Sequence, residues 1–269
     1  MNTSNNNKII KTSINSEGIL RIVLDNPKNH NTLSENMMNS IQLALDESRN
    51  DSKVRVVIIS ANGPTFSAGH DLKELRQGRQ SKDRGQTYFT QVMLKCSKLM
   101  RSIVNNPKPV IAEVNGVATA AGCQLVASCD LAYASSSASF ATPGVNIGLF
   151  CSTPMVALSR NISNKHSMEM LLTGDFITSI KAAQIGLINE SIKDKDLKAY
   201  VLEKAIKISK KSAMTLKTGK EAFYKQLEMN LLEAYDFASK VMVENMLKHD
   251  AEEGIDAFIE KRNPSWQDK

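Results

Sequence analysis

The sequence has little of what several classes of protein require. Aromatic residues make up only 5% of the 269 residues, and the lysines and arginines do not cluster around them. A nucleic-acid-binding surface is therefore not expected. No apolar run is long enough to span a bilayer, so no membrane segment is expected either. The four cysteines form no CxxC pair and match no zinc spacing with the four histidines, which predicts reduced thiols and no metal site.

The N-terminus also lacks the features of a targeting segment. Its first 13 residues are polar and rich in asparagine, with neither an apolar core nor an arginine-rich amphipathic pattern. This composition predicts no signal or transit peptide and a cytoplasmic protein. Residues 1–8 are predicted to be disordered.

What is present suits a folded α/β protein. Hydrophobic residues make up 42% of the chain, enough for a sizeable core, and the formal net charge is +6. That charge fits either a solvated surface or some affinity for an anionic ligand. The pattern predicts a core over residues 9–200 and a helical region over 201–269. The expected strands are residues 9–14, 18–25, 54–60, 110–114, 131–134 and 139–141. The expected helices are residues 35–48, 88–104 and 122–128, with seven more segments between 152 and 260.

Two turns of small residues follow expected strands. The first is FSAGHD at residues 66–71, and the second is VNGVATAAGCQ at residues 114–124. Small residues let a ligand approach the main chain, and the second turn opens a helix whose first N–H groups are free. Two such N–H groups directed at one carbonyl oxygen form an oxyanion hole. Each turn by itself could equally serve close packing.

Taken together, about fifty residues apart, the two turns resemble those of the crotonase (enoyl-CoA hydratase/isomerase) family. The resemblance covers residues 14–266, and two longer runs, 118–130 and 140–154, resemble one branch of the family. It continues through FATP at 140–143, LTGD at 172–175, AAQIGLI at 182–188 and EGIDAF at 253–258.

The resemblance implies a fold and a ligand. The fold is α/β, a crotonase-like ββα spiral core with a C-terminal helical oligomerisation region, and the assembly is a homotrimer or hexamer. The small-molecule ligand is an acyl-CoA or enoyl-CoA, with coenzyme A as part of the substrate and no separate cofactor. The backbone N–H groups of His70 and Ala121 match the family's oxyanion hole.

Further residues match the family's coenzyme A contacts. Lys28 and His30 match positions near the phosphates. Phe258 and Lys261 match residues that reach the ligand of a neighbouring subunit, although a core Phe and a solvated Lys are equally consistent with the pattern. The segment expected against adenine and pantetheine comprises Ala68, Gly69, His70, Asp71 and Leu72.

The sequence departs from the family at both catalytic glutamates. The two positions hold Gln124, which cannot ionise, and Gly144, which has no side chain. General acid–base groups contribute roughly 10²–10⁴-fold each. Little conventional hydratase activity is therefore expected, and isomerase activity is disfavoured as well.

Other side chains could replace them. The candidates are the thiol of Cys151, the imidazole of His70 and a water held by Gln124. Cys151 could instead be a small buried apolar residue, and the ring of His70 could instead cap a loop or face solvent.

Four further polar residues near the motifs have structural interpretations. Ser152 is expected to cap the following helix. Glu113 could face a cleft, but a surface or interface position is favoured. Asp71 and Asp130 are expected to hold loops.

Three functions remain open. The favoured hypothesis is an enzyme of the hydratase/isomerase type that stabilises a thioester enolate. The alternatives are a noncatalytic acyl-CoA-binding or regulatory protein, and a structural oligomer with a vestigial pocket. The sequence does not define the acyl chain or the reaction.

Overall fold

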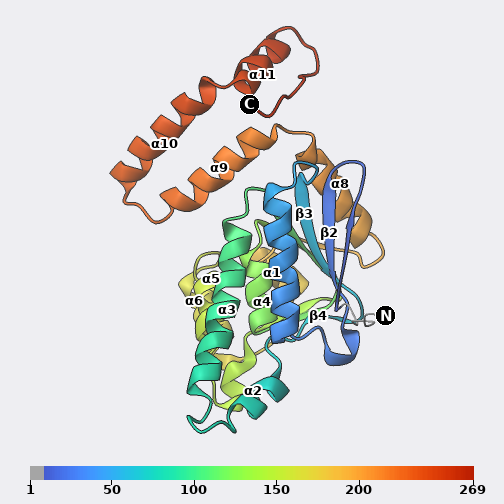
Figure 1. The fold of residues 1–269 in the computed structure, drawn as a ribbon, viewed down its shortest axis with the longest axis vertical. Coiled ribbons are helices and arrows are strands. Elements are labelled where there is room, and N and C mark those ends of the chain that lie inside the picture. Colours follow the sequence, from blue (N-terminus) through green and yellow to red (C-terminus); the bar gives the residue numbers. More distant parts are fainter. Residues whose placement is uncertain (1–8) are drawn as a thin grey trace, which may run out of the picture.

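The computed structural model describes residues 9–269, in which helices surround two sheets (Figure 1). The disorder expected for residues 1–8 lies outside the described residues. Within the described chain, the larger sheet has six strands in the order β1-β2-β3-β5-β7-β10. β1 and β2 form an antiparallel hairpin, and the remaining neighbours are parallel. The strands are β1 (Ile10–Ile14), β2 (Ile19–Leu24), β3 (Val56–Ala61), β5 (Val110–Val114), β7 (Leu131–Ser135) and β10 (Glu190–Ile192).

Of a second, smaller sheet, only the strand at residues 139–141 was predicted from the sequence. The order of this sheet is β4-β6-β8-β9, with β6 lying between β4 and β8. Three-residue strands are too short to show a period, so β6 lies in a stretch expected to be only a turn. The bounds are β4 (Thr65–Ser67), β6 (Val117–Thr119), β8 (Ser139–Ala141) and β9 (Ile177–Thr178). Three successive strand pairs, β3–β4, β5–β6 and β7–β8, each add one strand to each sheet before the next helix, which confirms the ββα spiral.

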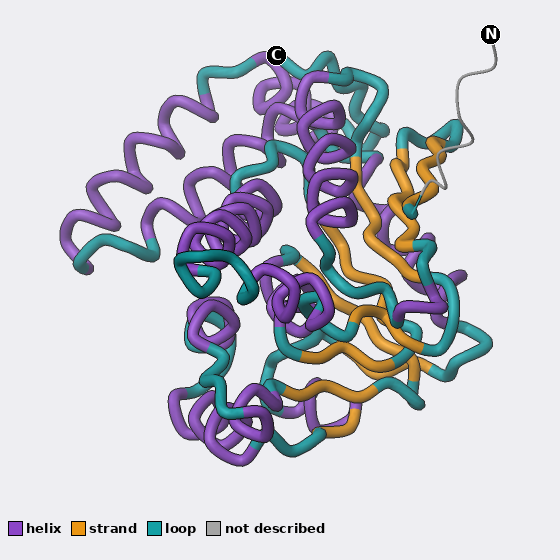
Figure 2. Tube along the Cα trace, turned by 60° about the horizontal axis from the view of Figure 1, so that its bottom comes forward, coloured by secondary structure: helices purple, strands orange, loops and turns teal. Residues whose placement is uncertain are grey.

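Helices cover both faces of the larger sheet. Ser34 caps α1 as expected, because its hydroxyl accepts from the N–H of Met37 at 3.2 Å. On the same face of the sheet as α1 lie α3 and α4, and α8 covers the opposite face with Val201 and Ala205. In Figure 2 the helices lie mainly to the left of the strands, and the β1–β2 hairpin stands at the outer edge. The helices of this part are α1 (Glu35–Asn50), α2 (Leu72–Gly78), α3 (Gln86–Val104), α4 (Ala121–Ser128), α5 (Ser152–Leu158), α6 (Asn164–Thr173), α7 (Ser179–Gln184) and α8 (Leu197–Ser209). Two 3-10 turns, η1 (Pro27–Asn29) and η2 (Pro143–Ile147), join them.

A helical arm projects from this core (Figure 1). It consists of α9 (Ala213–Gln226), α10 (Leu231–Met246) and α11 (His249–Ile259). The expected boundary after residue 200 falls inside α8, which packs on the larger sheet. No residue of α10 is buried, and Leu231 is 75% exposed. In the part of the chain that the structure describes, no helix is both long and apolar enough to cross a membrane.

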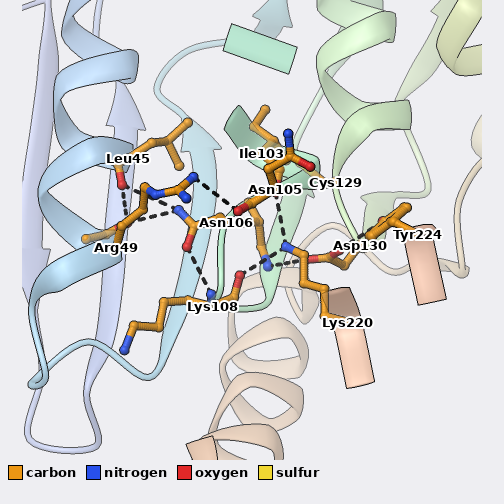
Figure 3. Close-up of polar contacts among 12 residues, drawn as sticks. Leu45, Arg49, Ile103, Asn105, Asn106, Lys108, Cys129, Asp130, Lys220 and Tyr224 are labelled. Atoms are coloured by element: carbon orange, nitrogen blue, oxygen red, sulfur yellow. Dashed lines mark hydrogen bonds and ion pairs between the residues drawn. The ribbon is translucent and has the colours of Figure 1, made fainter. Parts of the chain in front are cut away.

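The arm is fixed to the core by buried polar contacts from α9 (Figure 3). The ammonium group of Lys220 donates to Asp130 at 2.6 Å and to the carbonyls of Ile103 and Lys108. The hydroxyl of Tyr224 donates to the other oxygen of Asp130 at 2.9 Å. Asp130 therefore joins the arm to the strand edge, which agrees with the structural role expected for it.

Candidate active site

The two small-residue turns meet at the end of the smaller sheet. β4 and β6 run parallel, with Ser67 opposite Ala118, so the turns that follow them lie side by side. A Cβ on Gly122 would lie 2.2 Å from the carbonyl oxygen of Ser67. A Cβ on Gly69 would lie 3.1 Å from the backbone nitrogen of Ala121, and Gly69 has φ +85°. Only glycine fits at these two positions without a shift of the neighbouring atoms. The two glycines therefore mark a close contact between the backbones of the two turns.

The amide groups at this contact are free. Ala121 is the first residue of α4, and Ala120 before it has φ 49° and no side chain that caps the helix. The first N–H groups of a helix lack intrahelical partners. Among the described residues, the N–H groups of His70 and Ala121 donate no hydrogen bond. The two amides expected to form an oxyanion hole are therefore both available at one place.

Gln124 lies one turn further along α4. Its side chain is buried. The thiol of Cys96 on α3 donates to Oε1 of Gln124, with 3.8 Å between sulfur and oxygen. Burial raises the pKa of the Cys96 thiol to about 12, so the proton stays on sulfur. No pattern in the sequence indicates this contact, since Cys96 comes from a separate helix. Gln124 is held as a neutral amide with its oxygen turned toward Cys96.

Position 144 is closed to a side chain. A Cβ on Gly144 would lie 2.8 Å from Sγ of Cys151 and 2.7 Å from the carbonyl oxygen of Leu149. Cys151 is 8% exposed and stands at the N-cap of α5. The expectation that Ser152 caps this helix is wrong, because Ser152 is its first residue and its hydroxyl donates to the carbonyl of Phe150 at 3.3 Å. The thiol occupies the space in which a glutamate at 144 would begin.

The ring of His70 is enclosed. Both ring nitrogens are buried, and neither has a hydrogen-bond partner among the described residues. Burial lowers the pKa of this imidazole, and the backbone of Leu33 opposes the shift. A solvent-facing position of the ring nitrogens is therefore wrong, and the loop cap stays a prediction. His70 contributes a free backbone amide, and the two nitrogens of its ring are buried.

The nearby carboxylates have structural partners. Asp71 caps α2 by accepting from the N–H of Lys73 at 2.8 Å, as expected of a residue that holds a loop. Glu113 is buried and pairs with Arg21 at 2.7 Å, so the surface position is wrong and the interface position stays a prediction. Glu113 also points to the same side of β5 as Ile111, which packs under α8 and away from α4. Neither of these two acids is a free base at the turns.

The residues expected to contact coenzyme A separate into two groups. Lys28 is exposed in η1, and His30 just after it accepts from the N–H of Ala68 through its carbonyl at 3.1 Å. This loop and Leu72, which is 55% exposed, therefore lie beside the first turn. Phe258 and Lys261 lie on or after α11, at the far end of the molecule from α2 (Figure 1). Within one chain, the first group lies beside the first turn and the second does not.

Comparison with known proteins gives the family. The family model described as Enoyl-CoA hydratase/isomerase matches residues 14–269. The chain belongs to this family. It is 48% identical over 250 residues to the mouse (Mus musculus) "Enoyl-CoA hydratase domain-containing protein 3, mitochondrial", covering 93% of this chain and 82% of the relative. The family resemblance in the sequence is thereby confirmed, down to the branch suggested by residues 118–130 and 140–154.

Solved structures agree. The crystal structure of human enoyl coenzyme A hydratase domain-containing protein 3 superposes with a TM-score of 0.91 at 47% identity, covering 96% of this chain and 100% of the other. An enoyl-CoA hydratase from Mycobacterium smegmatis superposes with a TM-score of 0.91 at 41% identity, covering 96% and 98%.

The expected cytoplasmic location is corrected by these relatives. The proteins from mouse, rat and human all carry the word mitochondrial in their names. The polar composition of the first residues, on which the cytoplasmic prediction was based, is therefore a poor guide to location.

Proposed function

We propose that this protein binds an acyl-CoA or enoyl-CoA thioester with its carbonyl oxygen between the amides of His70 and Ala121. The observation that supports this most directly is the contact at Gly69, where a Cβ would stand 3.1 Å from the Ala121 nitrogen. Two preorganised donors aimed at one oxygen stabilise the negative charge that develops there. For a thioester, that charge is an enolate.

The chemistry that follows is enolate formation with little hydration. Addition of water needs groups that take and give its proton, and the two positions that would do so hold a neutral amide at Gln124 and no side chain at Gly144. The thioester carries its own coenzyme A, and the proposed step needs no separate cofactor. An enzyme of the hydratase/isomerase type is the favoured function.

Lys28 and His30 support the coenzyme A half of the proposal. They lie in the loop that contacts the first turn, and Lys28 is exposed and cationic. A phosphate beside this loop places the pantetheine arm along Ala68–Leu72 and the thioester at the two amides. The mitochondrial names of the relatives support a mitochondrial location for this activity.

Thioester binding is the first test. We expect butyryl-CoA to bind roughly tenfold to a hundredfold more tightly than S-butyl-CoA, the thioether without a carbonyl, because two hydrogen bonds of about 1 kcal/mol each are lost. Isothermal titration calorimetry measures both. The variant Gly69→Ala, which places a methyl group against the Ala121 amide, should lose the difference, with circular dichroism to show that it folds. Absence of heat and of any thermal shift at submillimolar butyryl-CoA would contradict the proposal.

A homotrimer or hexamer is proposed for the assembly. On the arm, the side chain of Phe258 is 86% exposed and that of Leu247 is 81% exposed, and α10 has no buried residue. A second copy of the chain is the partner proposed to cover this apolar surface. Such a copy could bring Phe258 and Lys261 to a neighbour's ligand. Light scattering should give three or six times the chain mass of 29.6 kDa. A monomer would contradict both the assembly and the role of Lys261.

Two alternatives give different results in the same experiments. A noncatalytic acyl-CoA-binding or regulatory protein binds butyryl-CoA but exchanges no α-proton with solvent. A structural oligomer with a vestigial pocket assembles without binding any thioester. The family relationship favours the enzyme, since two free amides remain where charge would develop.

A further inference from the structure

The residues that follow α11 turn back toward the link between α8 and α9. Residues 262–269 form neither helix nor strand. The N–H groups of Gln267 and Asp268 donate to the carboxylate of Asp250, near the start of α11, at 2.8 and 2.9 Å. Asp250 is 2% exposed and is one of the two buried residues of α11. The returning segment is therefore held against the start of this helix.

The side chain of Asp268 joins the arm to the core. One of its oxygens accepts from the N–H of Ala213, the first residue of α9, at 2.6 Å. The other oxygen pairs with Arg55, which directly precedes β3 and also donates to the carbonyl of Lys211 at 2.7 Å. A carboxylate at a helix N-terminus is stabilised by the helix dipole. Through this one residue α11, α9 and the core are connected.

Trp266 makes a second connection beside the first. Its indole N–H donates to the carbonyl of Lys210, the residue that ends α8, at 2.9 Å. A Cβ on Gly254, inside α11, would stand 3.2 Å from the ring of Trp266. Glycine is unfavourable inside a helix, and here the indole packed against it accounts for its presence.

Two strained residues bracket the segment. Lys261 at its start has φ 57°, and Asp268 near its end has φ 59°. The left-handed region is costly for residues other than glycine, and it persists only where surrounding contacts enforce it. The contacts of Trp266 and Asp268 therefore maintain a conformation that a free segment would leave.

We propose that residues 266–268 are a strap that ties α11 to the α8–α9 link and to the core, and that α11 detaches from the base of the arm when the strap opens. Opening breaks hydrogen bonds and one ion pair, and no covalent bond. Phe258 lies on α11 and Lys261 follows it directly, so the state of the strap decides where these two exposed side chains stand.

Hydrogen–deuterium exchange and the emission of Trp266, the single tryptophan of the chain, report the state of the strap. In Asp268→Ala we expect the backbone amides of α11 to exchange roughly tenfold to a hundredfold faster than in the wild type, because a hydrogen bond and an ion pair of one carboxylate are lost. The emission should move to longer wavelength as the indole becomes hydrated, while the amides of β3 keep their rates. Gln267→Ala is the matched control, because the contact of Gln267 with Asp250 uses its backbone alone.

Gly254→Leu opens the strap from the opposite side. The new side chain takes the place of the indole, whereas leucine itself favours the helix. We expect the same shift in emission with helical content retained in circular dichroism, so this variant decides the matter even if Asp268→Ala does not fold.

Unchanged emission in Gly254→Leu, or unchanged α11 exchange in folded Asp268→Ala, would overturn the strap. Equally fast exchange in Gln267→Ala would overturn it as well. None of these measurements uses a thioester. Failure of butyryl-CoA to bind therefore leaves the strap standing, and failure of the strap leaves the proposed thioester site standing.

Discussion

Replacing Lys220 by alanine is expected to lower the free energy of unfolding by about 3–5 kcal/mol, because it leaves a buried carboxylate without its counter-charge. The side chain of Lys220 is 8% exposed and that of Asp130 16%. Burial raises the pKa of the Asp130 carboxyl, and the Lys220 ammonium opposes that shift. Without the ammonium, the N–H of Val110 and the hydroxyl of Tyr224 remain as donors to an uncompensated charge (Figure 3). Urea denaturation at fixed protein concentration measures the loss.

The matched control is another ion pair between the arm and the core. Arg160 and Glu228 also join them, at 3.4 Å, but their side chains are 57% and 69% exposed. Exposed pairs contribute about 0–1 kcal/mol, so Arg160→Ala should change little. Making the buried pair neutral with Lys220→Met and Asp130→Asn should be milder than Lys220→Ala alone. If Lys220→Ala and Arg160→Ala were equally mild, the buried pair would not be what holds α9.

The sequence predicted those parts of the fold that depend on local spacing. The cap at Ser34 and the buried face of α1 follow from one residue type and a helical period, and both are present. The α/β alternation followed from strands of five or six residues. Most of the smaller sheet did not, because a strand of three residues such as β4 or β6 is too short to show a period.

The candidate site was predictable in its backbone and not in its side chains. Glycine at 69 and 122 marks two close backbone approaches, and that information is local. The thiol of Cys96 at Gln124 and the thiol of Cys151 at Gly144 are contacts between separate elements. The enclosed ring of His70 likewise depends on how the loop at Leu33 packs over it. Such contacts are set by tertiary packing, and a single sequence shows no pattern for them.

The largest expected effect concerns hydration itself. We expect this protein to hydrate crotonyl-CoA at least about 10⁴-fold more slowly than an enoyl-CoA hydratase that carries both glutamates, because two acid–base groups worth roughly 10²–10⁴-fold each are absent. The loss of enoyl absorbance measures the rate for both proteins at equal concentration. Calorimetry with butyryl-CoA is the accompanying control, since slow hydration is informative only if the thioester binds. A rate similar to that of the hydratase would show that water can be activated without carboxylates at 124 and 144.

Introducing glutamates at positions 124 and 144 should not raise the hydration rate to that of the hydratase. In Gln124→Glu with Gly144→Glu, the Cβ at 144 meets the carbonyl oxygen of Leu149 at 2.7 Å and the thiol of Cys151 at 2.8 Å. A backbone oxygen does not move aside as the end of a side chain does, so the new carboxylate enters only if the loop from Gly148 to Phe150 shifts. We expect the double variant to stay within about tenfold of Gln124→Glu alone, which is its matched control. A further gain of 10²-fold or more in the double variant would mean that position 144 is open in solution. In that case the absence of a side chain, and not the closure of the site by Cys151, would explain slow hydration.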